Sequence, residues 1–190
     1  MNPLINPDHL YSRSEVLSKP SPVPASSGIY AWYFCDVPGA IPTQGCISSD
    51  AKTLLYVGIS PDKRSKPSST QTLRKRITYH CRGNSEGSML RRTLGVLLAK
   101  ESGFPLRRVG SGKRMTLSHQ GEEWLDNWMD ENAFVCWMAH SSPWQIEQVL
   151  ISSTALPLNI QGNTHPFTEE LKTLRKHAIA HARALPVISG

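Results

Sequence analysis

Two short segments rich in aromatic and β-branched residues, 29–35 and 54–58, constrain the fold of this 190-residue chain more than any other feature. Such segments are typical of β-strands. The stretch between them is polar and contains Pro and Gly, so no crossover helix joins the two strands and antiparallel pairing is expected. This pairing would bring Tyr30 and Tyr56 into one neighbourhood. Residues 133–139 (AFVCWMA) predict a third strand.

Apolar residues at helical spacing predict helices around these strands. The expected ranges are 73–81, 88–100, 118–132, 142–154 and 166–184. Residues 60–70 are expected to be a loop, and residues 103–117 have the pattern of a hairpin around a Gly-Ser-Gly turn. Residues 1–25 are expected to form an N-terminal appendage that ends in a Pro-rich linker, and residues 26–190 to form one domain.

Charge is segregated along the chain. The net charge is +6, but residues 63–114 carry fourteen Lys or Arg and only two acidic residues. Residues 118–150 carry six acidic residues and no Lys or Arg. A run of like charge can be merely a solvated face. An excess of twelve positive charges within one part of a folded domain instead favours polyanion binding.

Several classes of protein are not indicated by the sequence. No apolar run approaches the ~20 residues that a membrane-spanning helix needs, and the N-terminal residues lack the pattern of a signal peptide. The four cysteines show no CxxC pair and no metal-ligand spacing, so reduced thiols are expected. A cytoplasmic location is therefore expected.

Arg76 and His80 lie four residues apart in the predicted helix 73–81, so their side chains share one face. A guanidinium keeps its charge and offers two parallel donors to phosphate oxygens. The neighbouring Arg74, Lys75 and Arg82 support a second interpretation, in which the whole helix coats backbone phosphates. Spacing alone does not separate the two.

Glu147 falls on the apolar side of the predicted helix 142–154. A carboxylate that faces a core needs a cation or hydrogen-bond donors. A structural salt bridge would satisfy it, and so would one Mg²⁺ ion whose other ligands are water and phosphate. Considered singly, Tyr30 and Tyr56 would be ordinary strand aromatics and Asn159 a turn residue.

These pieces form one ordered set along the chain. The set runs from Gly28-Ile29-Tyr30 through Tyr56-Val57-Gly58 and the Arg-x-x-x-His of residues 76–80 to Glu147 and the Leu-Pro-Leu-Asn that ends at Asn159. It resembles the GIY-YIG endonuclease superfamily over residues 28–159, with Val in place of the Ile of the YIG motif. The resemblance implies an α/β (α+β) fold, with a small central antiparallel sheet of three strands flanked by helices.

The resemblance also implies a role for each chemical group. Tyr30 would be the general base, assisted by His80, and Tyr56 would hold the water or the phosphate. Arg76 would stabilise the pentavalent phosphorane, and Glu147 would bind one Mg²⁺ or Mn²⁺ ion. The amide at position 159 would orient this network.

Specificity would come from outside these residues, from a basic insertion at about 82–117 and from the appendage of residues 1–25. The residues expected to contact nucleic acid are Arg74, Lys75, Arg82, Arg91, Arg92, Arg107, Arg108, Lys113 and Arg114. A β-ribbon over residues 103–117 could enter a groove, or it could clamp phosphates without reading bases.

The function expected from these inferences is metal-dependent cleavage of DNA. Two alternatives remain open: a binding module on the same fold that has lost catalysis, and an enzyme or toxin that cleaves RNA by the same chemistry. The expected partner is nucleic acid, with DNA preferred. A single active site cuts one strand, so clean double-strand cleavage would require a homodimer or two successive cuts, and a separate specificity partner is a further option.

Overall fold

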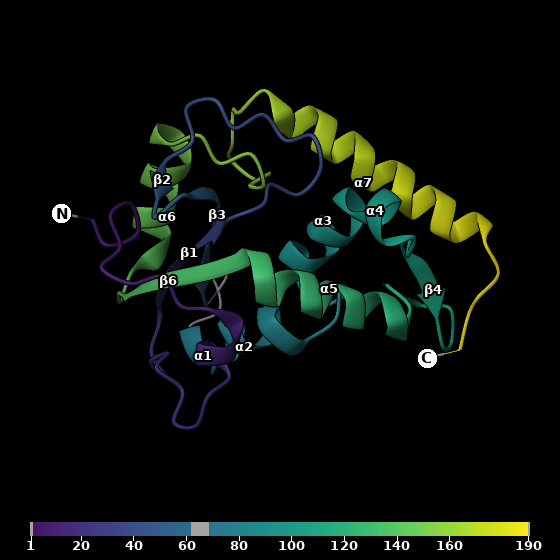
Figure 1. The fold of residues 1–190 in the computed structure, drawn as a ribbon, viewed down its shortest axis with the longest axis horizontal. Coiled ribbons are helices and arrows are strands. Elements are labelled where there is room, and N and C mark those ends of the chain that lie inside the picture. The colour runs from purple at the N-terminus through teal and green to yellow at the C-terminus, as the bar shows by residue number, and fades with distance from the viewer. Residues whose placement is uncertain (1, 62–68, 190) are drawn as a thin grey trace.

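The computed structural model describes residues 2–61 and 69–189. Its centre is an antiparallel sheet with the strand order β2-β3-β1-β6 (Figure 1). The strands are β1 (Gly28–Phe34), β2 (Ser48–Ser49), β3 (Lys52–Ser60) and β6 (Ala133–Ala139). The mixed α/β fold and the three longer strands agree with the sequence-based prediction, but the sheet has four strands where three are expected.

The additional strand, β2, pairs with the start of β3 through a two-residue turn. Asp50 and Ala51 form this turn, with left-handed φ angles of 49° and 57°. Tight hairpin turns of this kind usually contain Gly or Asn, which adopt positive φ at little cost. The pair Asp-Ala lacks that signal, and two residues are too few to show alternation, so the sequence does not predict the strand.

The central strand β1 is buried along its whole length, and its alternating side chains enter two separate cores. Tyr30, Trp32 and Phe34 pack into one core, and the three residues that alternate with them pack into the other. Pairing with β3 places Tyr30 opposite Gly58. Because both faces are covered, the sheet is the middle layer of the fold.

Seven helices surround the sheet in the described part of the chain: α1 (Arg13–Val16), α2 (Leu73–Arg82), α3 (Met89–Leu97), α4 (Ala99–Ser102), α5 (His119–Asn132), α6 (Pro143–Ser153) and α7 (Phe167–Ala184). Helices α2, α3, α5 and α7 contribute to the core that contains Tyr30, whereas α6 contributes to the other core. Figure 1 shows α7 running alongside α3 and α4. The helix predicted over 88–100 is interrupted at Leu98, where ψ is 1°.

The N-terminal residues pack on this framework. Leu4, Leu10, Val16 and Val23 are buried, and Tyr11 forms an antiparallel bridge beside β6. The capping box that begins α1 at Ser12 is present. The predicted division of the chain at residue 25 stays a prediction.

The predicted hairpin over residues 103–117 consists of β4 (Arg107–Val109) and β5 (Arg114–Thr116). Ile188 pairs beside it, so the C-terminal tail continues this small sheet. Most of the loop expected over residues 60–70 lies outside the described residues. None of the described helices combines the length and the apolar character that crossing a membrane requires.

Candidate active site

One pocket of about 720 Å³ contains most of the candidate catalytic groups. Tyr30 of β1, Tyr56 of β3, Arg76 of α2, Glu147 of α6 and Asn159 all line it. These side chains come from four secondary-structure elements and one loop, so only the folded sheet and its flanking helices bring them together. Its volume is within the range of small-molecule and substrate sites.

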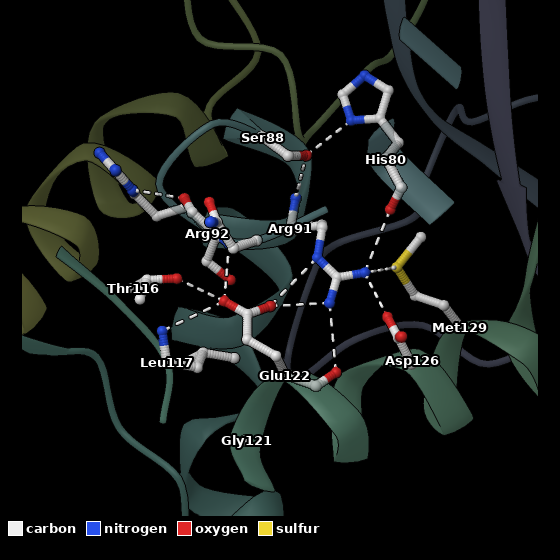
Figure 2. Close-up of polar contacts among 12 residues, drawn as sticks. His80, Ser88, Arg91, Arg92, Thr116, Leu117, Gly121, Glu122, Asp126 and Met129 are labelled. Carbon is white, nitrogen blue, oxygen red and sulfur yellow. Dashed lines mark hydrogen bonds and ion pairs between the residues drawn. The ribbon is translucent and has the colours of Figure 1, made fainter. Parts of the chain in front are cut away.

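His80 does not line the pocket but lies directly behind it. It is fully buried, and its Nε2 lies 2.8 Å from the Tyr30 hydroxyl. Its Nδ1 lies 2.7 Å from the Ser88 hydroxyl. A chain of three polar side chains therefore runs from the pocket into the interior, and Figure 2 shows its inner half, from His80 to Ser88.

The hydrogen bonds of Ser88 assign the tautomer of His80. Ser88 caps α3, and its oxygen accepts the backbone N–H of Arg91 at 3.1 Å. In the described residues, the acceptor within reach of its buried hydroxyl hydrogen is His80 Nδ1. A neutral His80 then carries its proton on Nε2 and donates to Tyr30. This donation favours the phenolate form of the tyrosine.

The electrostatic surroundings keep His80 neutral. Burial lowers its pKa well below the ordinary value of 6.5, and the charges of Arg76 and Arg91 lower it further. Burial raises the pKa of Tyr30, and the charge and hydrogen bond of Arg76 oppose that rise. The phenolate form of Tyr30 therefore needs a cation or a hydrogen-bond donor at its oxygen to stabilise the negative charge.

The buried His80 predicts a loss of stability in acid. The pKa of His80 in the folded protein lies well below 6.5. Below pH 6.5, this residue is therefore protonated in the unfolded chain but still neutral in the folded chain. Lowering the pH from about 7.5 to about 5.5 should reduce the free energy of unfolding by up to about 1.4 kcal/mol per pH unit from this residue. Urea denaturation across that range measures the slope.

His80→Gln should flatten this pH dependence, whereas His177→Gln at an exposed position of α7 should leave it unchanged. An equal slope in both variants would show that His80 is not its source. Protonation of Glu122 should also reduce the free energy of unfolding, but at a lower pH than His80 does. Its burial raises its pKa, but hydrogen bonds from Thr116 and the charge of Arg91 hold that pKa below 4.5.

Gly58 allows the Tyr30 ring to reach its position. A Cβ atom at residue 58 would lie 2.5 Å from the Tyr30 hydroxyl oxygen and 2.7 Å from its Cζ. These distances are far shorter than a van der Waals contact, so a side chain at Gly58 and the present Tyr30 ring exclude one another. The final Gly of Tyr56-Val57-Gly58 is therefore required by the tyrosine on the neighbouring strand.

Gly58→Ala should displace the Tyr30 hydroxyl and reduce cleavage of nucleic acid by about 10- to 100-fold, since small displacements of a catalytic group cost this much. The same crowding should cost about 1–3 kcal/mol of stability. Cleavage rates and urea denaturation measure both effects. Gly95→Ala is the matched control, because there the added Cβ meets only the flexible Leu117 side chain. Full activity of Gly58→Ala would contradict the assigned role of the ring position.

Asn159 acts on the backbone of β3. Its Oδ1 accepts the Val57 N–H at 2.9 Å, and its Nδ2 donates to the Val57 carbonyl at 2.8 Å. Leu158 adds a bond to the Leu55 carbonyl. The segment that ends in Asn159 therefore pairs with β3 beyond the short β2 and fixes the strand that carries Tyr56. It can orient the site through that strand.

Tyr56, Arg76 and Glu147 complete the polar wall of the pocket. The rings of Tyr30 and Tyr56 lie 6.5 Å apart. Burial raises the pKa of Tyr56, and the charges of Tyr30 and Glu147 raise it further, whereas that of Arg76 lowers it. Arg76 Nη1 donates to the Gly87 carbonyl at 3.3 Å. These four side chains are close enough to influence one another electrostatically.

Glu147 fits the requirements of a magnesium ligand. It is partly exposed and contributes a carboxylate to the pocket. Within residues 2–61 and 69–189, no group of three or more His, Cys, Asp or Glu side chains gathers as in an all-protein metal site. Mg²⁺ commonly binds one or two carboxylates and takes its other ligands from water and phosphate. A single carboxylate in the same pocket as the Arg76 guanidinium is consistent with that mode.

The structure corrects the expectation for Arg91. Its side chain is fully buried and forms ion pairs with Glu122 at 2.8 Å and Asp126 at 2.6 Å (Figure 2). It therefore stabilises the packing of α3 on α5 and is not available to nucleic acid. The helix face that it occupies is set by tertiary packing, which the sequence pattern does not specify.

The other basic candidates fall into two groups. Five donate to backbone carbonyls within the protein: Arg74, Lys75, Arg92, Arg107 and Arg108. The other three, Arg82, Lys113 and Arg114, are exposed. Contact of these eight residues with nucleic acid stays a prediction.

Sequence reasoning does not identify Ser88, Met89 or Arg175 as part of the site. Ser88 holds His80, and the other two side chains line the pocket. The capping position of Ser88 before α3 is visible in the sequence, but its proximity to His80 depends on the turn after α2. Arg175 lies in a long basic helix whose inward face becomes clear only once α7 packs.

Comparison with known families supports this architecture. Residues 28–177 match the family model described as the GIY-YIG catalytic domain. No curated protein and no solved structure matches the chain. The matched segment covers most of the chain and includes all six predicted catalytic residues.

Proposed function

Because the chain belongs to the GIY-YIG catalytic domain family, whose activity is nuclease activity, we propose that it is a metal-dependent endonuclease that hydrolyses DNA phosphodiester bonds in this pocket. The observation that carries the proposal is the hydrogen-bonded chain Tyr30–His80–Ser88, which ends in a pocket that also contains Arg76 and Glu147. These groups supply a base, a cation for phosphate and a metal ligand.

The protein groups divide the work of hydrolysis. Burial disfavours the phenolate of Tyr30, and the His80 Nε2–H and Arg76 offset part of that cost, so that the phenolate oxygen can accept a proton from the attacking water. The water oxygen bonds to phosphorus as the bond to the leaving oxygen breaks. Arg76 donates to the non-bridging oxygens as their charge develops, a stabilisation of about 3–4 kcal/mol for a well-placed donor. Tyr56 orients the water or the phosphate.

Glu147 would hold a Mg²⁺ or Mn²⁺ ion, which when bound neutralises charge on the scissile phosphate. Asn159 keeps Tyr56 in place through Val57. The neutral state of His80 suits its task, because a protonated imidazole would add repulsion to a site that already contains Arg76. The exposed basic residues support binding of the polyanion.

Nicking of supercoiled plasmid in Mg²⁺, in Mn²⁺ and in EDTA tests the proposal. Relaxed product is expected with either metal and none with EDTA. Arg76→Ala, purified in parallel, should nick at least about 100-fold more slowly and so controls for contaminating nucleases. Equal nicking by Arg76→Ala would contradict the proposed site.

The same assay on single-stranded DNA and on RNA separates the other classes of substrate. Cleavage of RNA alone would assign the site to RNA hydrolysis. Binding without cleavage of any substrate would assign the protein to the class of catalytically inactive binding modules.

A further inference from the structure

Arg175 introduces a second guanidinium into the candidate active site. It belongs to α7, outside the motif residues, and lines the same pocket as Tyr56, Arg76 and Glu147. Helix α7 packs beside α3. The first residue of α3, Met89, also lines the pocket. A second positive charge therefore reaches the pocket, and it comes from α7.

The surroundings of Arg175 are unusual among the arginines of this protein. Its Nη2 contacts the thioether sulfur of Met89, which is a weak acceptor. No carboxylate in the described residues forms an ion pair with it. By contrast, Arg13 and Arg91 are paired with carboxylates, and several other arginines donate to backbone carbonyls.

A partly buried guanidinium with a sulfur partner is energetically costly, since its charge has lost part of its hydration. Burial lowers the pKa of Arg175, repulsion from Arg92 lowers it further, and the nearby Tyr56 raises it. The group nevertheless stays charged, because arginine does not deprotonate in proteins. An anion in the pocket would remove this cost.

The anion that fits is a second phosphate of the same strand. Arg76 is electrostatically coupled to Tyr30 and His80, the proposed base and its partner. Arg175 lies near Tyr56 and Arg92, so Tyr56 is the group that both guanidinium charges reach. The two cations come from different helices, α2 and α7, and line one pocket with Tyr56, so a strand whose scissile phosphate lies at Arg76 can present a neighbouring phosphate to Arg175.

We propose that Arg175 binds a phosphate that flanks the scissile phosphate, so that the pocket recognises two consecutive phosphates of one nucleic-acid strand. This inference rests on the proposed function for the identity of the strand. It assigns α7 a part in substrate binding. Arg175 is in this view a substrate-positioning residue, since it contacts a phosphate that does not react.

Binding of a short DNA duplex in EDTA tests the inference without any cleavage. Arg175→Gln should bind about tenfold more weakly than the wild type and should lower the slope of log K against log salt by about one. Lys176→Gln, which removes the same charge from the next, exposed position of α7, should change affinity less than about twofold. The affinity of Arg175→Lys should lie between those of Arg175→Gln and the wild type, because an ammonium keeps the positive charge but lacks the two parallel donors of a guanidinium.

A duplex with one neutral methylphosphonate beside the cleavage position locates the contact. At one flanking phosphate, this substitution should lower the affinity of the wild-type protein about as much as Arg175→Gln does. It should not lower the affinity of the Arg175→Gln protein further. Equal affinity and salt slope for Arg175→Gln and Lys176→Gln would overturn the inference. So would affinity losses from Arg175→Gln and from the methylphosphonate that add up at every flanking position.

The failure of this inference is distinguishable from a failure of the proposed function. If the wild type cleaves nothing but binding still depends on Arg175, the second phosphate contact stands and the catalytic proposal fails. If the wild type nicks plasmid and Arg175→Gln binds and turns over normally, catalysis stands and Arg175 has no part in it. Near-ultraviolet circular dichroism of each variant verifies that α7 remains packed.

Discussion

Glu147→Gln should abolish metal-dependent cleavage while it leaves nucleic-acid binding intact. Gln has the shape of Glu but lacks the charge that attracts a divalent cation. In the described residues Glu147 is the carboxylate that lines the pocket. The loss should be at least about a thousandfold, equivalent to about 4 kcal/mol of transition-state stabilisation. Single-turnover cleavage of a labelled duplex measures it.

The expected binding behaviour separates this effect from misfolding. Removal of a negative charge beside the phosphates should leave affinity equal or increase it. Glu123→Gln is the matched control, because it makes the same chemical change at an exposed position of α5 outside the pocket. A Glu147→Gln protein that cleaves within about tenfold of the wild type in Mg²⁺ would sink the assignment of the metal to this residue.

Arg91→Met should destabilise the folded protein strongly, and more than Gly58→Ala does. The guanidinium is fully buried and donates to Glu122, Asp126 and the His80 carbonyl. Met fills much of the same space but leaves Glu122 without its cation and Asp126 with Arg13 alone. Breaking a buried ion pair by removal of one partner costs about 3–5 kcal/mol. Urea denaturation measures the loss.

The remaining partners of the two carboxylates place the loss near the lower end of that range. Glu122 keeps hydrogen bonds from Ser85 and Thr116, and Asp126 keeps Arg13 at 2.9 Å. Arg82→Met, at an exposed position of α2, should change stability by less than about 0.5 kcal/mol. If Arg91→Met loses less than about 1 kcal/mol, the buried network contributes little net stability.

The combination of Arg91→Met with Glu122→Gln adds a second check. If the two groups act as one pair, the double variant should lose less than the sum of the single losses. Arg91→Met should also slow cleavage, because Arg91 holds the His80 carbonyl at the end of α2.

The sequence predicts the parts of this fold that depend on local pattern. The β6 range 133–139 and the start of α2 at Leu73 follow from β-propensity and helical spacing, which local residues determine. The ordered motif also identifies the pocket groups, because each needs a particular chemical type at a particular place. Strand β2 escapes prediction because its turn is formed by Asp50-Ala51, in which Ala stands where a hairpin turn usually has Gly.

The roles of the arginines escape prediction for a different reason. Arg91 and Arg92 are adjacent and chemically identical, yet Arg91 is sealed between α3 and α5 whereas Arg92 donates to loop carbonyls. The outcome depends on which face of α3 meets the acidic side of α5. Net charge along the chain therefore overstates the positive surface, since part of the basic insertion neutralises the acidic helix that follows it.

The distribution of the pocket groups along the chain has a consequence for synthesis. Tyr30 emerges early, whereas Glu147 and Asn159 follow more than a hundred residues later. A ribosome that adds ~5–20 residues per second leaves the partial chain without the proposed metal ligand Glu147 and without the amide that fixes β3 for several seconds. The proposed active site is therefore incomplete in the nascent chain, and cleavage is expected only after α6 and the segment that ends in Asn159 have packed on the sheet.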